Sequence, residues 1–156
     1  MNELTINDRF RLLCPEGIRI MTDEEREKRD LPADRDTLCL TNEAGSMIVS
    51  IGWKTVSVVA NLALYLIRPV VSMEASVNQA MSGYGYRKET MLSRQIGGCP
   101  AQGFRFAYSA GGPMVGESYV IREGRSLTFF HVYLREDQRD ACLDQWNLLL
   151  DQVQSR

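Results

Sequence analysis

The chain has 156 residues, of which 44% are hydrophobic and 24% are charged. These proportions are those of an ordinary globular domain, and they exclude intrinsic disorder, fibrous structure and a small disulfide-rich scaffold. Eighteen basic residues against twenty acidic ones give a net charge of −2, so we expect no nucleic-acid partner. We expect one globular domain over residues 1–156.

The first part of the chain alternates short strands with turns. Strands are predicted over residues 9–14, 17–21 and 37–40. Residues 22–36 are mostly charged, and the spacing of Thr22 and Glu25 is that of a capping box, which predicts a short surface helix ending before Pro32. This segment is either a solvated surface or an acidic docking surface for a basic partner.

An unusually apolar segment follows a predicted buried strand at residues 46–52. Its helical periodicity over residues 56–67 gives two apolar stripes. The first stripe is expected to pack on the sheet and consists of Val56, Val59, Ala60, Ala63 and Leu66. The second stripe, Val58, Leu62 and Tyr65, either contacts another chain or is covered by the next helix. Trp53, at the entry to the helix, belongs either to the core or to the same contact surface.

The rest of the chain predicts a helix, a group of strands and a final helix. Ser72 can cap a helix over residues 73–81. Four strands joined by short turns predict an antiparallel meander over residues 86–96, 102–109, 114–122 and 126–134. The last of these strands is apolar on both faces, so it should be central and covered on both sides. A helix over residues 137–154 presents one apolar stripe that includes Trp146.

Residues that carry chemistry are sparse. His131 is the only histidine, and its place in an apolar strand favours a core or interface residue with one hydrogen bond. Glu117 is either a binding residue or a solvent-facing strand residue, and the strand alternation favours solvent. The glycines match no phosphate-binding motif, and we expect no cofactor.

The four cysteines are expected to be free thiols. Cys14, Cys39, Cys99 and Cys142 are widely spaced and form no zinc or redox motif, so we expect neither a metal site nor a disulfide. The first residues do not have the pattern of a signal peptide, and the longest apolar run is shorter than the ~20 residues of a membrane span. We therefore expect a cytosolic protein, although a chain whose targeting segment had been removed would have the same sequence.

Several short motifs resemble one group of proteins. Cys14-Pro-Glu-Gly17 resembles the proline-glycine turn near the start of the Mog1p/PsbP-like families, and the loop over residues 97–104 resembles the loop before their glycine-aromatic strand. Gly116 to Val120 and Phe129-Phe130 resemble the meander that follows. The resemblance implies an α+β fold, an α/β/α sandwich around a mainly antiparallel sheet. Families of this group include a binder of a nuclear-transport GTPase, a photosystem subunit, periplasmic lipoproteins and bacterial chaperones for apolar helices, so fold alone does not select a function.

Two hypotheses about function follow. The first is a non-enzymatic binding or accessory protein, chaperone-like or adaptor-like, which contacts a partner protein or a second copy through Trp53, Val58, Leu62 and Tyr65. The second is a small-ligand carrier or an enzyme with a pocket at one end of the sheet near His131. An enzyme would have to draw its acid, base and nucleophile from His131, Glu117 and a cysteine.

Overall fold

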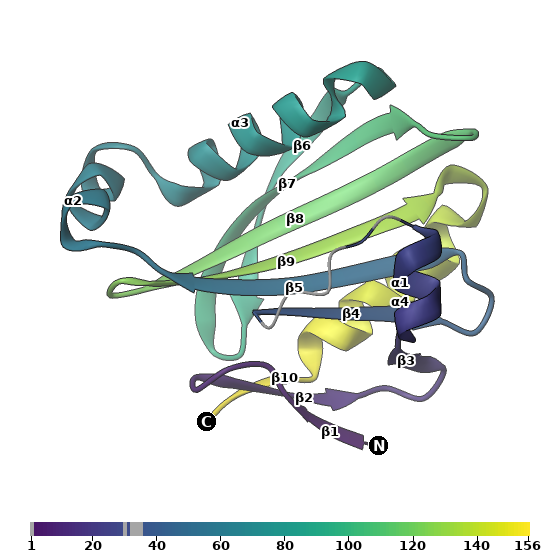
Figure 1. Ribbon diagram of the computed structural model, residues 1–156, viewed down its shortest axis with the longest axis horizontal. Helices are drawn as coiled ribbons and strands as arrows, with labels where there is room; N and C mark the ends of the chain where they lie inside the picture. Colours follow the sequence, from purple (N-terminus) through teal and green to yellow (C-terminus); the bar gives the residue numbers. More distant parts are fainter. Residues whose placement is uncertain (1, 30, 32–35) are drawn as a thin grey trace.

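A seven-stranded antiparallel sheet crosses the centre of the molecule, as the computed structural model in Figure 1 shows. The structure describes residues 2–29, 31 and 36–156. The strand order is β3-β4-β5-β9-β8-β7-β6. The strands are β3 (Ile18–Ile20), β4 (Thr37–Asn42), β5 (Met47–Thr55), β6 (Arg87–Ile96), β7 (Cys99–Ser109), β8 (Pro113–Glu123) and β9 (Ser126–Arg135).

Helices lie on both faces of this sheet (Figure 1). The face covered by α4 (Arg139–Asp151) is called the α4 face, and the opposite one, where α3 (Pro69–Met81) packs on β7 and β8, is called the α3 face. β9 is central and supplies buried residues to both faces: Phe130 and Val132 to the α4 face, and Leu127 to the α3 face. The expected α+β sandwich around an antiparallel sheet is confirmed.

The meander of β6, β7, β8 and β9 is also confirmed, with each strand pairing with the next. A glycine sets the spacing of its aromatic side chains. Phe106 on β7 lies opposite Gly116 on β8, and a Cβ atom at Gly116 would be only 2.2 Å from the Phe106 ring. The ring therefore occupies the space that any other residue at position 116 would need.

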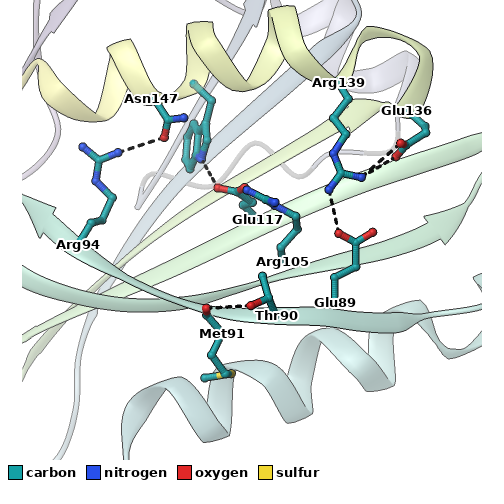
Figure 2. Close-up of polar contacts among 10 residues, drawn as sticks. Glu89, Thr90, Met91, Arg94, Arg105, Glu117, Glu136, Arg139 and Asn147 are labelled. Carbon is teal, nitrogen blue, oxygen red and sulfur yellow. Dashed lines mark hydrogen bonds and ion pairs between the residues drawn. The ribbon is translucent and has the colours of Figure 1, made fainter.

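The strand β6 forms one edge of the sheet, and its register with β7 shifts between Lys88 and Thr90. Two side chains of this strand bond to the carbonyl of the residue that follows. Thr90 Oγ1 donates to the Met91 carbonyl at 3.2 Å, as Figure 2 shows, and Arg94 Nε donates to the Gln95 carbonyl at 3.1 Å. β6 therefore contains a bulge, and two of its backbone carbonyls accept hydrogen bonds from its own side chains.

A second, smaller sheet was not fully predicted. It has the order β1-β2-β10 and joins β1 (Asn2–Thr5), β2 (Phe10–Cys14) and β10 (Val153–Ser155). The predicted final helix over residues 137–154 was too long, because α4 ends at Asp151 and the chain then pairs with β2. Val153 fits the apolar stripe of the helix, but it is buried as a strand residue opposite Leu12.

The remaining helices are short. α1 (Asp23–Lys28) has the predicted capping box of Thr22 and Glu25, and Pro32, before which it was expected to end, lies outside the described residues. α2 (Val58–Leu66) is capped by Ser57 and extends from one end of the sheet (Figure 1). α3 begins at Pro69, a residue that suits the first turn of a helix, so the predicted start at Met73 with Ser72 as its cap was too late. Short 3-10 turns follow α3 and precede α4, at Ser82–Tyr84 and Glu136–Gln138.

Candidate functional site

A groove of about 500 Å³ lies on the α3 face between α2, α3 and β9. Its volume is within the range of small-molecule sites. Its floor is formed mainly by β9 and its sides by the two helices. The lining residues are Lys54, Val56, Ala60, Ala63, Pro69, Ser72, Met73, Ser76, Val77, Ala80, Met81, Leu127, Phe129, His131 and Tyr133.

Small residues on both helices line the groove. α2 contributes Ala60 and Ala63, and α3 contributes Ser72, Ser76 and Ala80. The larger apolar residues of α2 whose side chains the structure describes do not line the groove; they are Val58, Val59, Leu62 and Leu66. The first apolar stripe of this helix was predicted to pack on the sheet. This prediction was wrong for Val59 and Leu66, which are 78% and 89% exposed.

The floor of the groove carries a row of rings along β9. Phe129, His131 and Tyr133 are two residues apart, so the strand alternation places them on the same face. The Phe129 and His131 ring centroids are 6.2 Å apart, and those of His131 and Tyr133 are 6.3 Å apart, both in stacked orientation. The row is a half-buried, flat aromatic surface.

His131 is held by one hydrogen bond. Its Nδ1 atom lies 2.6 Å from Ser118 Oγ on the neighbouring strand β8. Burial lowers the pKa of His131 to about 4, so the ring is neutral at neutral pH. A neutral ring with one hydrogen-bonded nitrogen agrees with the predicted core or interface histidine that makes one hydrogen bond.

Lys54 supplies the positive charge at this site. Its Nζ atom lies 5.6 Å from the centre of the Phe129 ring, and its side chain lines the groove. None of the described residues that line the groove is acidic. Among these residues the groove is mainly apolar, and the Lys54 ammonium group lies beside the aromatic row.

The outer face of α2 is a separate surface, formed by Val58, Val59, Leu62 and Leu66. Val58 and Leu62, two of the predicted contact residues, are 60% and 61% exposed. α3 therefore does not cover them, which was the alternative left open by the sequence. The side chain of Tyr65 lies outside the described part of the structure.

Trp53 does not belong to this surface. It is a β5 residue that packs against the core on the α4 face, opposite Thr128 of β9. The chain enters α2 on the opposite face of the sheet, where Val56 packs against the core of the α3 face. The predicted grouping of Trp53 with Val58 and Leu62 is therefore corrected, because strand alternation turns Trp53 away from α2.

The α4 face holds a buried carboxylate that is hydrogen-bonded on both of its oxygens. Glu117 is 2% exposed, so the expectation that it faces solvent was wrong. Its carboxylate accepts a hydrogen bond from Trp146 Nε1 at 3.1 Å. It also accepts one from Arg105 Nε at 2.7 Å, and Figure 2 shows Arg105 beside Glu117. The buried indole needs an acceptor, and a carboxylate on the strand beneath α4 provides it.

Two further arginines fasten α4 to the sheet beside Glu117 (Figure 2). Arg94 of β6 donates to Asn147 at 3.1 Å and to Asp151 at 2.5 Å. Arg139 of α4 donates to Glu89 of β6 at 3.0 Å. Each of these arginines has an acidic partner, so this face has a structural role.

The residues named for an enzyme do not converge. His131 lies on the α3 face and Glu117 on the α4 face, because adjacent positions on β8 point to opposite sides. Cys39 is on the same face as His131, but Ser50 of β5 lies between them in the strand register. Each of the four cysteines is a free thiol, and three of them are buried.

Neither a metal centre nor a membrane helix stands out in the described residues. Within residues 2–29, 31 and 36–156, no three histidine, cysteine or acidic residues are grouped so that they could hold a metal ion. Over the same part of the chain, no helix is both long and apolar enough to cross a membrane.

Comparisons with known proteins identify the fold of this chain but assign it to no family. No family model matches the chain, and no curated protein matches its sequence. Among solved structures, the solution structure of the cyanobacterial PsbP protein CyanoP from Synechocystis matches 96% of this chain and 88% of its own length, with a TM-score of 0.64 and 13% identity.

Two other solved structures are similar over most of this chain. LpqN, described as involved in cell envelope biogenesis of Mycobacterium tuberculosis, matches 94% of this chain and 82% of its own, with a TM-score of 0.50 and 14% identity. The type VI secretion immunity protein TplEi from Pseudomonas aeruginosa matches 92% of this chain and 55% of its own, with a TM-score of 0.51 and 13% identity. The chain has the PsbP-like fold, which confirms the resemblance in the sequence at the level of fold.

Proposed function

We propose that this PsbP-like chain is a non-enzymatic accessory protein that binds a partner protein through the outer face of α2. The observation that carries the proposal is the exposure of Val58, Val59, Leu62 and Leu66 on one short helix. Burying a large apolar side chain stabilises a complex by about 1.5–3 kcal/mol. An apolar patch of this kind is typical of an interaction surface.

The helix is fixed in place although its outer face is uncovered. Ser57 Oγ accepts from the Ala60 amide at 3.1 Å and caps the first turn. Arg122, on β8, donates to Asn61 Oδ1 at 2.6 Å, and Arg125 donates to the Val56 carbonyl at 2.8 Å. These bonds anchor α2 to the β8–β9 hairpin, so the apolar outer face is presented on a supported helix.

The similar structures support an accessory role at the level of class. They include a PsbP protein and an immunity protein, neither of which is described as an enzyme. The cytosolic location expected from the sequence remains a prediction, as does the single-domain organisation.

The test compares one double glutamate variant with one single glutamate variant. Val58→Glu with Leu62→Glu places charges on the outer face of α2, and Leu148→Glu places the same charge on an exposed leucine of α4. Tagged wild-type protein and both variants are used for affinity capture from the source cells, and their masses are measured by light scattering. We expect a stoichiometric partner or dimer with the wild type and with Leu148→Glu, and its loss with the α2 variant.

The contrary outcome is equally clear. If the α2 variant is folded by circular dichroism and still retains the same partner or dimer, α2 is not the contact surface.

A second function, a small-ligand carrier, is favoured by the 500 Å³ groove beside His131. Its surface is distinct from the outer face of α2, since Ala60 and Ala63 line the groove while Val58 and Leu62 are exposed to solvent. Ligand binding that survives the α2 double variant would separate this function from partner binding.

A further inference from the structure

We propose that the groove on the α3 face binds an amphiphile of the fatty-acid class, with its apolar chain between α2, α3 and β9 and its carboxylate at Lys54. The inference rests on the carrier function above and adds the chemical class of the ligand. It is independent of partner binding through the outer face of α2.

The walls of the groove suit an alkyl chain. Met73, Val77 and Leu127 are buried core residues at its base, and Phe129 adds an aromatic surface. The small residues Ala60, Ala63, Ser76 and Ala80 leave room above them. A long, narrow apolar ligand buries most of its surface in such a space without displacing the core.

The charge of the groove favours an anionic end. Among the described residues, Lys54 has no carboxylate within ion-pair distance, and none of those that line the groove is acidic. Residues 44–73, which include Lys54 and all of α2, contain neither aspartate nor glutamate. His131 is neutral because its burial lowers its pKa to about 4, so it adds no competing charge.

Neighbouring arginines extend the positive potential around α2. Arg125 of the β8–β9 hairpin bonds to the Val56 carbonyl, which is uncharged. Arg68 is the N-cap residue of α3. A monoanion approaching this end of the molecule therefore encounters mainly positive charge, which favours an anionic ligand over a cationic one.

The experiment is a calorimetric titration with three probes of equal chain length, each kept below its critical micelle concentration. The probes are dodecanoate, dodecanol and dodecyltrimethylammonium. We expect one dodecanoate per chain, weaker binding of dodecanol and no measurable binding of the cationic probe.

Variants assign the binding to the groove. Lys54→Met keeps the aliphatic stem and should weaken dodecanoate binding roughly fivefold, the upper range for an exposed charge pair. Lys54→Arg should restore it. Ser76→Leu fills the groove from an exposed position on α3 and should abolish binding, whereas Lys28→Met on α1 removes a distant charge and should leave binding unchanged. Thermal melts establish that each variant is folded.

The outcomes separate the two levels of the proposal. If none of the probes binds the wild type, both the carrier function and its ligand class are wrong. If dodecanol binds as tightly as dodecanoate and Lys54→Met has no effect, the groove is a ligand site but the anionic end is wrong. Unchanged binding in folded Ser76→Leu protein would place the ligand elsewhere and overturn the inference.

Discussion

The two faces of the central sheet are built in opposite ways. On the α4 face, Glu117, Arg105 and Trp146 form a connected polar group under a helix whose apolar side is buried. On the α3 face, α3 covers β7 and β8, while a groove lies over β9 beside α2. The exposed large apolar residues of α2 are Val58, Val59, Leu62 and Leu66. The α4 face is thus closed by a helix with its own polar contacts, whereas the α3 face keeps an open groove, which is the surface proposed above to bind a ligand.

The largest expected effect is on the α4 face. Trp146→Ala removes a fully buried indole and leaves Glu117 without one of its donors. We expect a loss of about 3–5 kcal/mol in the free energy of unfolding, measured by urea denaturation. Trp146→Phe is the control, because it keeps a ring but loses the donor, and it should cost about 1–3 kcal/mol. A loss below 1 kcal/mol for Trp146→Ala would contradict a structural role for this face.

An intermediate effect is expected from acid on the α3 face. The pKa of His131 is about 4 in the folded protein and near its ordinary value of 6.5 in the unfolded chain. The unfolded state therefore takes up the proton first, so stability conferred by the neutral ring is present above pH 6.5 and is lost as the pH falls towards 4.

The measurement is urea denaturation of wild type and His131→Asn at pH 7 and pH 4.5. We expect the wild type to lose about 1–3 kcal/mol more than the variant, because other acid-sensitive groups are common to both. Equal losses in the two proteins would show that the ring is not kept neutral by burial.

The smallest expected effect is on the outer face of α2. Val59→Gln with Leu66→Gln replaces two exposed apolar residues and should change the free energy of unfolding by no more than about 0.5 kcal/mol. Leu149→Gln, the matched change at a buried position of α4, should cost several-fold more. If the α2 variant is as damaging as Leu149→Gln in the purified monomer, the outer face is part of the core and the comparison of the two faces fails.

The sequence was most informative where local periodicity and burial agree. The meander follows from alternation such as that of Phe104, Phe106 and Tyr108, and α4 from the helical spacing of Trp146 and Leu149. Periodicity gave the wrong element where one residue fits the pattern of both a helix and a strand. Val153 continues the helical stripe yet pairs in β10, and only the presence of β2 decides between them.

The candidate site was harder to predict because it depends on tertiary placement. The two apolar stripes of α2 are visible in the sequence. The distance between the helix and the sheet is not visible there, so Leu66 was expected to be buried although it is exposed. Glu117 was expected to face solvent because its acceptor role depends on Trp146, which is distant in the chain. Trp53 was grouped with α2 by proximity in sequence, although strand alternation sends the two to opposite faces.

The edge strand β6 has a consequence for self-association. An open edge of ten residues is a template on which another chain can add a strand, the step that begins aggregation. Since Ile96 pairs with Cys99 across a two-residue turn, the carbonyls of Met91 and Gln95 point away from β7. Thr90 and Arg94 already donate to those two carbonyls, and the bulge near Lys88 interrupts the rest of the edge. The edge therefore offers fewer free carbonyls to a neighbouring copy than its ten residues would otherwise present, while the chain keeps an exposed apolar helix on one side of its sheet.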